Sequence, residues 1–162
     1  MADDARADGP ESAPAGGSEA QSDDARTEDL AGDGPGVPVV ALDASALMAP
    51  VEADLRLFEE LDRLLGGYEA AVPTAVLAEL DGLQGGNGAE ATAASVGADL
   101  AERAEAVETD ESYADDALVA LAAAGRVDAV VTVDGPLAKR VLAVDAPVIG
   151  LRGRNTLAIT EP

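Results

Sequence analysis

Two aspartates in this sequence directly follow apolar runs. Asp43 follows residues 37–42, which include three valines and no polar residue, and Asp134 follows residues 129–133. Such runs are typical of strands buried on both faces of a parallel sheet. A residue directly after such a strand lies at its C-terminal end, the edge at which open α/β sheets bind ligands and metals. We therefore expect both aspartates to belong to a functional site.

Three more acids lie near the starts of predicted helices. Glu79 is about one turn into the helix after Pro73, on or beside an apolar stripe where a solvated acid would be badly placed. Asp115 and Asp116 lie in the first turns of another predicted helix, where a single acid is most often a cap or a partner of the helix dipole. In an α/β topology all these positions can converge with Asp43 at one edge of the sheet.

Two hydroxyl side chains lie two residues away from the sheet-end aspartates. Ser45 follows Asp43, and Thr132 precedes Asp134. Both hydroxyls could hydrogen-bond the carboxylates or a water on a metal, although isolated residues of these types are more often turn residues. We predict an auxiliary role for both.

The chain has no cysteine and no histidine. A metal site must therefore be built from oxygen ligands, which favour Mg²⁺ or Mn²⁺, with Ca²⁺ as an alternative. Clustered carboxylates typically clamp two divalent ions about 3.5–4 Å apart, and the ions stabilise the attacking and leaving oxygens of a phosphodiester. A metal ion also lowers the pKa of a bound water, so that no dedicated protein base is needed. These residue types favour metal-dependent phosphodiester hydrolysis.

The formal net charge is −22, with 32 acidic residues against 10 basic ones. Since phosphate contacts normally need cations, the protein either avoids polyanions or works in a halophilic cytoplasm. At about 1 M salt the Debye length is only ~3 Å, so the repulsion between the protein and RNA would be screened. Acidic residues are spread along the whole chain, which favours the explanation by a halophilic cytoplasm. No apolar run approaches the roughly 18 residues that span a bilayer, and the acidic N-terminus is no secretory signal. We expect a cytoplasmic protein that does not enter membranes.

The elements that must position these acids follow from the same patterns. We expect residues 1–36, with ten acids and two arginines, to be a disordered acidic extension, and residues 37–162 to form one domain. The alternation of strands and helices predicts βαβ units with right-handed crossovers, in a three-layer α/β/α sandwich with a mainly parallel central sheet. Strands are predicted at 37–42, 68–72, 106–108, 129–133, 147–150 and 156–159, and helices at 54–65, 74–84, 89–105, 109–124 and 136–142. A helix-like Ala/Leu/Met segment also follows Asp43 directly.

The apolar stripe of Leu55, Phe58 and Leu61 has two explanations. It can belong to the core, or it can be the interface through which two copies pair. A homodimer is therefore an alternative that the sequence leaves open.

Four segments in this order resemble the four-acid signature of PIN-domain ribonucleases: residues 42–45, 72–80, 114–118 and 131–134. The resemblance covers residues 37 to about 150 and is far more specific than any one segment. It is closest to the archaeal branch similar to small-subunit ribosomal RNA processing nucleases. VapC-type toxins share the fold and the site.

The resemblance implies a PIN-like fold and Mg²⁺- or Mn²⁺-dependent endonucleolytic cleavage of single-stranded RNA, leaving a 5′-phosphate and a 3′-hydroxyl. For the archaeal branch the substrate would be pre-rRNA. Matched by position, the catalytic and metal-binding quartet is Asp43, Glu79, Asp116 and Asp134. Asp115 is then an auxiliary acid. A toxin ribonuclease and a non-catalytic module that binds RNA or protein are the alternatives.

The sequence departs from the family pattern directly after the last acid. Residues 132–136 read Thr-Val-Asp-Gly-Pro where the related branch tends to have Thr-Asn-Asp-Arg, so an obvious phosphate contact is missing. The nearby cations that could replace it are Lys139, Arg140, Arg152 and Arg154, against the alternative that they are ordinary surface residues paired with acids. A receiver-like domain phosphorylated on Asp43 is a further alternative, but the sequence lacks a convincing lysine after a late strand.

Overall fold

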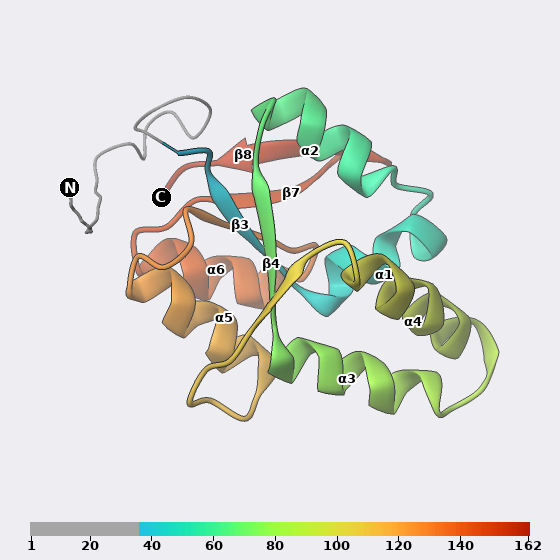
Figure 1. The fold of residues 1–162 in the computed structure, drawn as a ribbon. Coiled ribbons are helices and arrows are strands. Elements are labelled where there is room, and N and C mark those ends of the chain that lie inside the picture. Colours follow the sequence, from blue (N-terminus) through green and yellow to red (C-terminus); the bar gives the residue numbers. More distant parts are fainter. Residues whose placement is uncertain (1–35) are drawn as a thin grey trace. The chain divides into compact units, whose positions relative to one another are not determined.

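The computed structural model describes residues 36–162. The acidic extension predicted for residues 1–36 lies outside the described residues, apart from Gly36. Residues Val39–Pro162 form one compact unit, whose elements are labelled in Figure 1. In the described part of the chain, no helix combines the length and the apolar character needed to cross a membrane.

The strands of the described residues form one six-stranded sheet in the order β5-β4-β3-β6-β7-β8. Neighbouring strands are parallel, except for the antiparallel pair of β7 and β8. This confirms the mainly parallel central sheet. The strands are β3 Val39–Leu42, β4 Glu69–Pro73, β5 Glu105–Val107, β6 Ala129–Val131, β7 Val148–Arg152 and β8 Thr156–Thr160.

Helices cover both faces of this sheet. From β3 the chain continues through β4 to β5, and it then returns to β6 and β7 on the other side of β3. Because crossovers between parallel strands are right-handed, connections that run in opposite directions along the sheet place their helices on opposite faces. Accordingly α1, α3 and α4 pack together, and α5 packs against α6 (Figure 1). The three-layer α/β/α sandwich is confirmed. The helices are α1 Ala44–Glu52, α2 Leu57–Leu65, α3 Thr74–Gln84, α4 Gly88–Ala101, α5 Ala114–Ala123 and α6 Gly135–Ala143.

The two strands that precede the sheet-end aspartates lie in the middle of the core. Val40, Ala41 and Leu42 of β3 and all three residues of β6 have no exposed surface. This agrees with strands covered on both faces, which is why their sequence shows no polar alternation. The C-terminal ends of β3 and β6, which pair with each other, therefore lie at the buried centre of the sheet.

Two helices begin later than the sequence indicated. α2 begins at Leu57, because the backbone of Asp54 has a φ of 55°, in the left-handed region that right-handed helices exclude. α5 begins at Ala114, and the hydroxyl of Thr109 instead donates to the carbonyl of Glu111 at 3.4 Å. The loop before α5 is therefore longer than predicted.

The apolar stripe on α2 and before it belongs to the core. Leu55, Phe58 and Leu61 are 2%, 7% and 0% exposed. The guanidinium group of Arg103 lies 3.9 Å from the centre of the Phe58 ring and covers it. A homodimer could not pair through this stripe.

A ring of hydrogen bonds attaches β8 to α2. Oε1 of Glu60 accepts from the backbone N–H of Leu157 at 3.0 Å and from the guanidinium of Arg63 at 2.8 Å. The same guanidinium donates to the carbonyl of Leu157 at 2.7 Å. The hydrogen bond from Arg63 has the largest effect in holding the pKa of Glu60 below its ordinary value, and the hydrogen bond from Leu157 has the next largest.

We expect Glu60→Gln to remove a pH-dependent part of the stability. A carboxyl group whose pKa is lowered by folding stabilises the fold above its unfolded pKa, and the contribution is lost as the pH falls through the folded pKa. The free energy of unfolding in urea should therefore fall less between pH 7 and pH 3 in Glu60→Gln than in the parent protein. Glu59→Gln, one residue away and outside the ring, should behave like the parent. The same pH profile in both variants would contradict the prediction.

Candidate active site

The predicted acids are brought to one edge of the sheet. Asp43 and Asp134 are the N-cap residues of α1 and α6. Glu79 lies in α3, which begins directly after β4, and Asp115 lies in the first turn of α5. Because β3, β4 and β6 are parallel, their C-terminal ends lie at the same edge, where α3 and α5 also contact each other (Figure 1).

Asp43 is buried at this edge and is held by two hydroxyl groups. Its side chain is 4% exposed. Its Oδ2 accepts a hydrogen bond from Ser45 at 2.6 Å and another from Thr132 at 2.7 Å. Charge-assisted bonds of this length are strong, so they fix the orientation of the carboxylate.

The two hydroxyls are themselves oriented by the backbone of the β6–α6 connection. Oγ of Ser45 accepts from the N–H of Val133 at 3.0 Å, and Oγ1 of Thr132 accepts from the N–H of Asp134 at 3.0 Å. Each hydroxyl therefore has its single proton free to donate to Asp43, and the 3.1 Å approach of the two hydroxyl oxygens need not be a hydrogen bond. The network joins residues almost ninety positions apart.

We expect Thr132→Val to destabilise the protein by about 1–3 kcal/mol. Thr132 is 2% exposed, and valine keeps its shape while it removes one of the two donors to the buried Oδ2 of Asp43 and leaves the N–H of Asp134 without its side-chain acceptor. Thr132→Ser keeps the hydroxyl and removes one methyl group, so it should cost only about 1 kcal/mol. Urea denaturation at pH 7 measures both. A valine variant as stable as the parent would show that these bonds carry no net stability.

The charges of the neighbouring acids act on one another. The pKa of Glu79 is raised, first by partial burial of its carboxyl group and then by the negative charges of Asp43, Asp115 and Asp134. The residue as a whole stays exposed, so water screens part of this effect. The pKa of Asp115 is also raised, first by burial and then by Asp43 and Asp134. These four acids therefore share one electrostatic environment.

Asp116, unlike Asp115, makes a direct ion pair with Arg140, although the charge of Arg140 also acts on Asp115. Its Oδ1 accepts from the guanidinium of Arg140 at 2.9 Å, and the two side chains are 45% and 48% exposed. This ion pair joins α5 to α6 at the exposed rim of the candidate active site. The sequence predicts Asp116 as a ligand and Asp115 as auxiliary, whereas the charges of Asp43 and Asp134 are felt by Asp115.

The donors at this edge fit a divalent cation by type, although they are not gathered around one point. Oδ1 of Asp43 has no hydrogen-bond donor among residues 36–162, so a buried carboxylate oxygen keeps its lone pairs free. With the neighbouring carboxylates it makes the all-oxygen set that Mg²⁺ or Mn²⁺ prefers. Within the same range, no three acidic side chains could hold a metal ion as they stand. Like charges keep such side chains apart, and a cation would draw them together.

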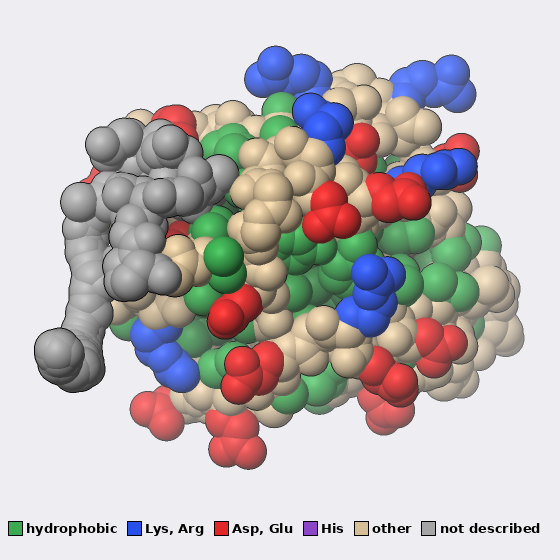
Figure 2. Space-filling model, turned by 45° about the horizontal axis from the view of Figure 1, so that its top comes forward, with side chains coloured by type: hydrophobic (Ala, Val, Ile, Leu, Met, Phe, Trp, Pro, Cys, Tyr) green, Lys and Arg blue, Asp and Glu red, His purple; other side chains and the backbone are tan. Residues whose placement is uncertain are grey.

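The predicted cations lie around the same edge. Lys139 and Arg140 belong to α6, Arg152 ends β7, and Arg154 follows in the turn to β8; all are exposed. β7 is parallel to β6, so its C-terminal end lies toward the edge that carries Asp134. Figure 2 brings the opposite end of the sheet, with α2 and β8, forward, and on the face that it draws basic side chains are scattered among acidic and apolar ones.

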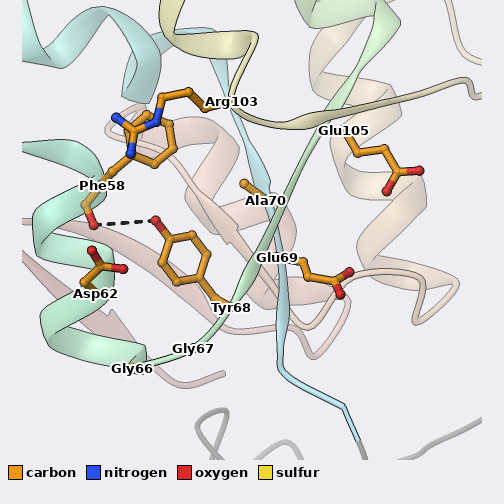
Figure 3. A pocket seen from close by; sticks show the side chains of 9 residues that line it. All are labelled: Phe58, Asp62, Gly66, Gly67, Tyr68, Glu69, Ala70, Arg103 and Glu105. Atoms are coloured by element: carbon orange, nitrogen blue, oxygen red, sulfur yellow. Dashed lines mark hydrogen bonds between the residues drawn. The ribbon is translucent and has the colours of Figure 1, made fainter.

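A hollow of about 640 Å³ lies away from these acids (Figure 3). Glu69 and Glu105 begin β4 and β5, so the hollow lies toward the N-terminal ends of these strands. A second hollow of about 330 Å³ beside α5 also contains none of the predicted site residues. The first hollow is lined by Phe58, Asp62, Gly66, Gly67, Tyr68, Glu69, Ala70, Arg103 and Glu105. The candidate active site is thus distinct from both hollows.

One residue beside the acids was not among the predicted site residues. Tyr113 is the N-cap residue of α5, and its side chain is 74% exposed. The signal for it in the sequence is its place two residues before Asp115, in a chain with only one Phe, two Tyr and no Trp.

Comparison with known proteins identifies the arrangement. A family model described as a PIN-like domain matches residues 40–154. A solved structure of the PIN domain endonuclease Utp24 superposes with a TM-score of 0.63 at 23% sequence identity, covering 76% of this chain and 92% of that chain. At this identity the likeness concerns the fold. A search of curated proteins finds no match.

Proposed function

The chain belongs to the family of PIN-like domains, and on this premise we propose that it is a divalent-metal-dependent endonuclease that cuts single-stranded RNA. The observation that carries the proposal is the buried carboxylate of Asp43, with one oxygen held by two hydroxyls, in the electrostatic environment of Glu79, Asp115 and Asp134. The shared fold with a PIN domain endonuclease supports the same class of reaction. We place its substrate in RNA processing, with pre-rRNA as the leading candidate and a toxin role as the alternative.

Each acid has a role that follows from its position. Mg²⁺ or Mn²⁺ held by these acids would stabilise the negative charge on the attacking and leaving oxygens of the phosphodiester. Asp43 is the principal ligand, and Ser45 and Thr132 hold it in one orientation, as a preorganised site requires. Asp134 lies in the β6–α6 connection and Glu79 in α3, so a cation bound at this edge would be held by carboxylates from separate elements.

For α5 we propose that Asp115 is the inner acid and Asp116 the outer one. The charges of Asp43 and Asp134 raise the pKa of Asp115, whereas Asp116 is held by Arg140 at the rim. In this assignment Asp116 keeps Arg140 beside the site. The roles are the reverse of those that the sequence resemblance implies.

A pair of matched variants tests this assignment together with the activity. We expect Asp115→Asn to lower the initial rate of cleavage of a labelled single-stranded RNA by about 100-fold, and Asp116→Asn by at most about 10-fold, since it acts through a neighbour. The assay uses Mg²⁺ or Mn²⁺ in molar KCl. A greater loss in Asp116→Asn would restore the roles that the sequence implies. No cleavage by the parent protein with either ion would refute the nuclease.

The basic residues and the overall charge complete the proposal. Lys139, Arg152 and Arg154 are the cations that would contact phosphates of the RNA, since Arg140 is already paired with Asp116. A net charge of −22 favours a cytoplasm of high salt, in which repulsion between the protein and RNA is screened.

A further inference from the structure

An exposed aromatic ring stands on a fixed backbone beside the acids. The chain has three aromatic residues; Phe58 is 7% exposed, whereas Tyr113 is 74% exposed. The carbonyl of Tyr113 accepts the hydrogen bond from the N–H of Ala117 at 2.9 Å that begins α5. A single exposed apolar residue is common on protein surfaces, so the exposure of Tyr113 alone does not indicate a function. The position of Tyr113 relative to the acids is more informative.

Tyr113 lies at the rim of the candidate active site. It is the N-cap residue of α5, two residues before Asp115, and α5 contacts both α3, which carries Glu79, and α6, which begins after Asp134. Val133, which is 36% exposed, is also at this rim, because its backbone N–H donates to Ser45, the residue that holds Asp43. The first turn of α5 and the β6–α6 connection thus each present an exposed apolar side chain beside the acids.

The charge of the protein makes apolar contacts more important than usual for RNA. With 10 basic residues against 32 acidic ones, few cations are left for phosphates, and Arg140 at the rim is already paired with Asp116. High salt weakens phosphate contacts further. Stacking of a base on an aromatic ring is tolerant of sequence and depends on no charge, so salt does not remove it.

We propose that Tyr113 is a stacking platform for a base of single-stranded RNA, with Val133 as an apolar neighbour of the bound strand. This rests on the proposed function, because the RNA must cross the rim to reach the acids. Tyr113 is a substrate-positioning residue in this proposal, with no part in the chemistry.

The test measures RNA affinity without cleavage. Full-length protein carrying Asp43→Asn is titrated into a fluorescein-labelled oligoadenylate of about ten nucleotides, and anisotropy gives the Kd with and without Tyr113→Ala. We expect Tyr113→Ala to raise the Kd about 5- to 100-fold, while Tyr113→Phe and Tyr113→Trp keep the affinity of the Asp43→Asn protein. Val51→Ala, at an apolar residue 43% exposed elsewhere, is the matched control and should change nothing.

Salt and an altered RNA separate stacking from other causes. Tyr113→Ala should lower affinity by the same factor at each salt concentration, whereas Arg154→Ala should reduce the slope of log affinity against log salt by about 0.7. With an oligomer that has abasic sites throughout, the effect of Tyr113→Ala should vanish. In cleavage assays of the protein with Asp43 intact, Tyr113→Ala should raise KM and leave kcat nearly unchanged.

The proposal is overturned if Tyr113→Ala binds the oligoadenylate as well as its parent, if the loss persists with abasic RNA, or if neither protein binds RNA. The proposed function fails on a separate result, equal cleavage by the protein with and without Asp43→Asn. An unchanged melting temperature in Tyr113→Ala should accompany the loss of affinity, since an exposed ring contributes little to the core.

Discussion

Replacing Asp43 with asparagine should lower the rate of RNA cleavage by at least about 100-fold. Asparagine keeps the shape of the side chain and an oxygen that accepts the hydroxyl protons of Ser45 and Thr132, so the network around it should survive. The negative charge that binds a cation is lost. Charge stabilisation by a metal ion is worth several kcal/mol, and about 1.4 kcal/mol corresponds to a factor of ten in rate.

The measurement is the initial rate of cleavage of a labelled single-stranded RNA in about 1 M KCl with Mg²⁺ or Mn²⁺. Asp81→Asn is the matched control, because Asp81 is an exposed acid of α3 two residues from Glu79 and does not act on the pKa of the clustered acids. It should cleave like the parent protein. Equal cleavage by the parent and by Asp43→Asn would mean that the activity arises from a contaminant or from another site.

Divalent ions should stabilise the folded protein strongly. Glu79 and Asp115 are surrounded by like charges that a cation would neutralise, and it would bind the folded arrangement but not the unfolded chain. At about 100 times its Kd such a ligand adds about 2.7 kcal/mol. In a domain of this size that corresponds to a rise of roughly 5–15 °C in melting temperature.

A thermal-unfolding series with Mg²⁺ or Mn²⁺ against KCl of equal ionic strength measures this shift. Asp43→Asn should lose most of it, and Asp81→Asn should keep it. No rise over the monovalent control in the parent protein would count against a metal site at this edge. A rise that Asp43→Asn retains would place the ion elsewhere.

The architecture could be predicted because its signals are local. Buried parallel strands have continuous apolar sequences, and helices follow them with regular stripes, so the order of elements in the described part of the chain and the three-layer sandwich follow from residues a few positions apart. The sheet-end place of Asp43 is equally local, because it depends only on where the preceding strand ends. The resemblance to PIN-domain ribonucleases rested on the same residues, and the family model agrees.

The start of α5 and the role of the stripe on α2 could not be predicted from local sequence signals. Thr109 uses its hydroxyl inside the loop, which delays the helix to Ala114, and Phe58 is core because Arg103 and the neighbouring elements cover it. A stripe has the same sequence whether its partner is the same chain or a second copy. Only the packed structure distinguishes these cases.

The sequence by itself determined which residue types reach the sheet edge, and in what order. Tertiary structure decided which of them face one another. Successive residues of a helix point about 100° apart, so Asp115 and Asp116 lie in different surroundings, and the packing of α5 against α6 brings Asp116 to Arg140. The bond from Thr132 to Asp43 spans 89 positions and exists only because β3 and β6 are neighbours in the sheet.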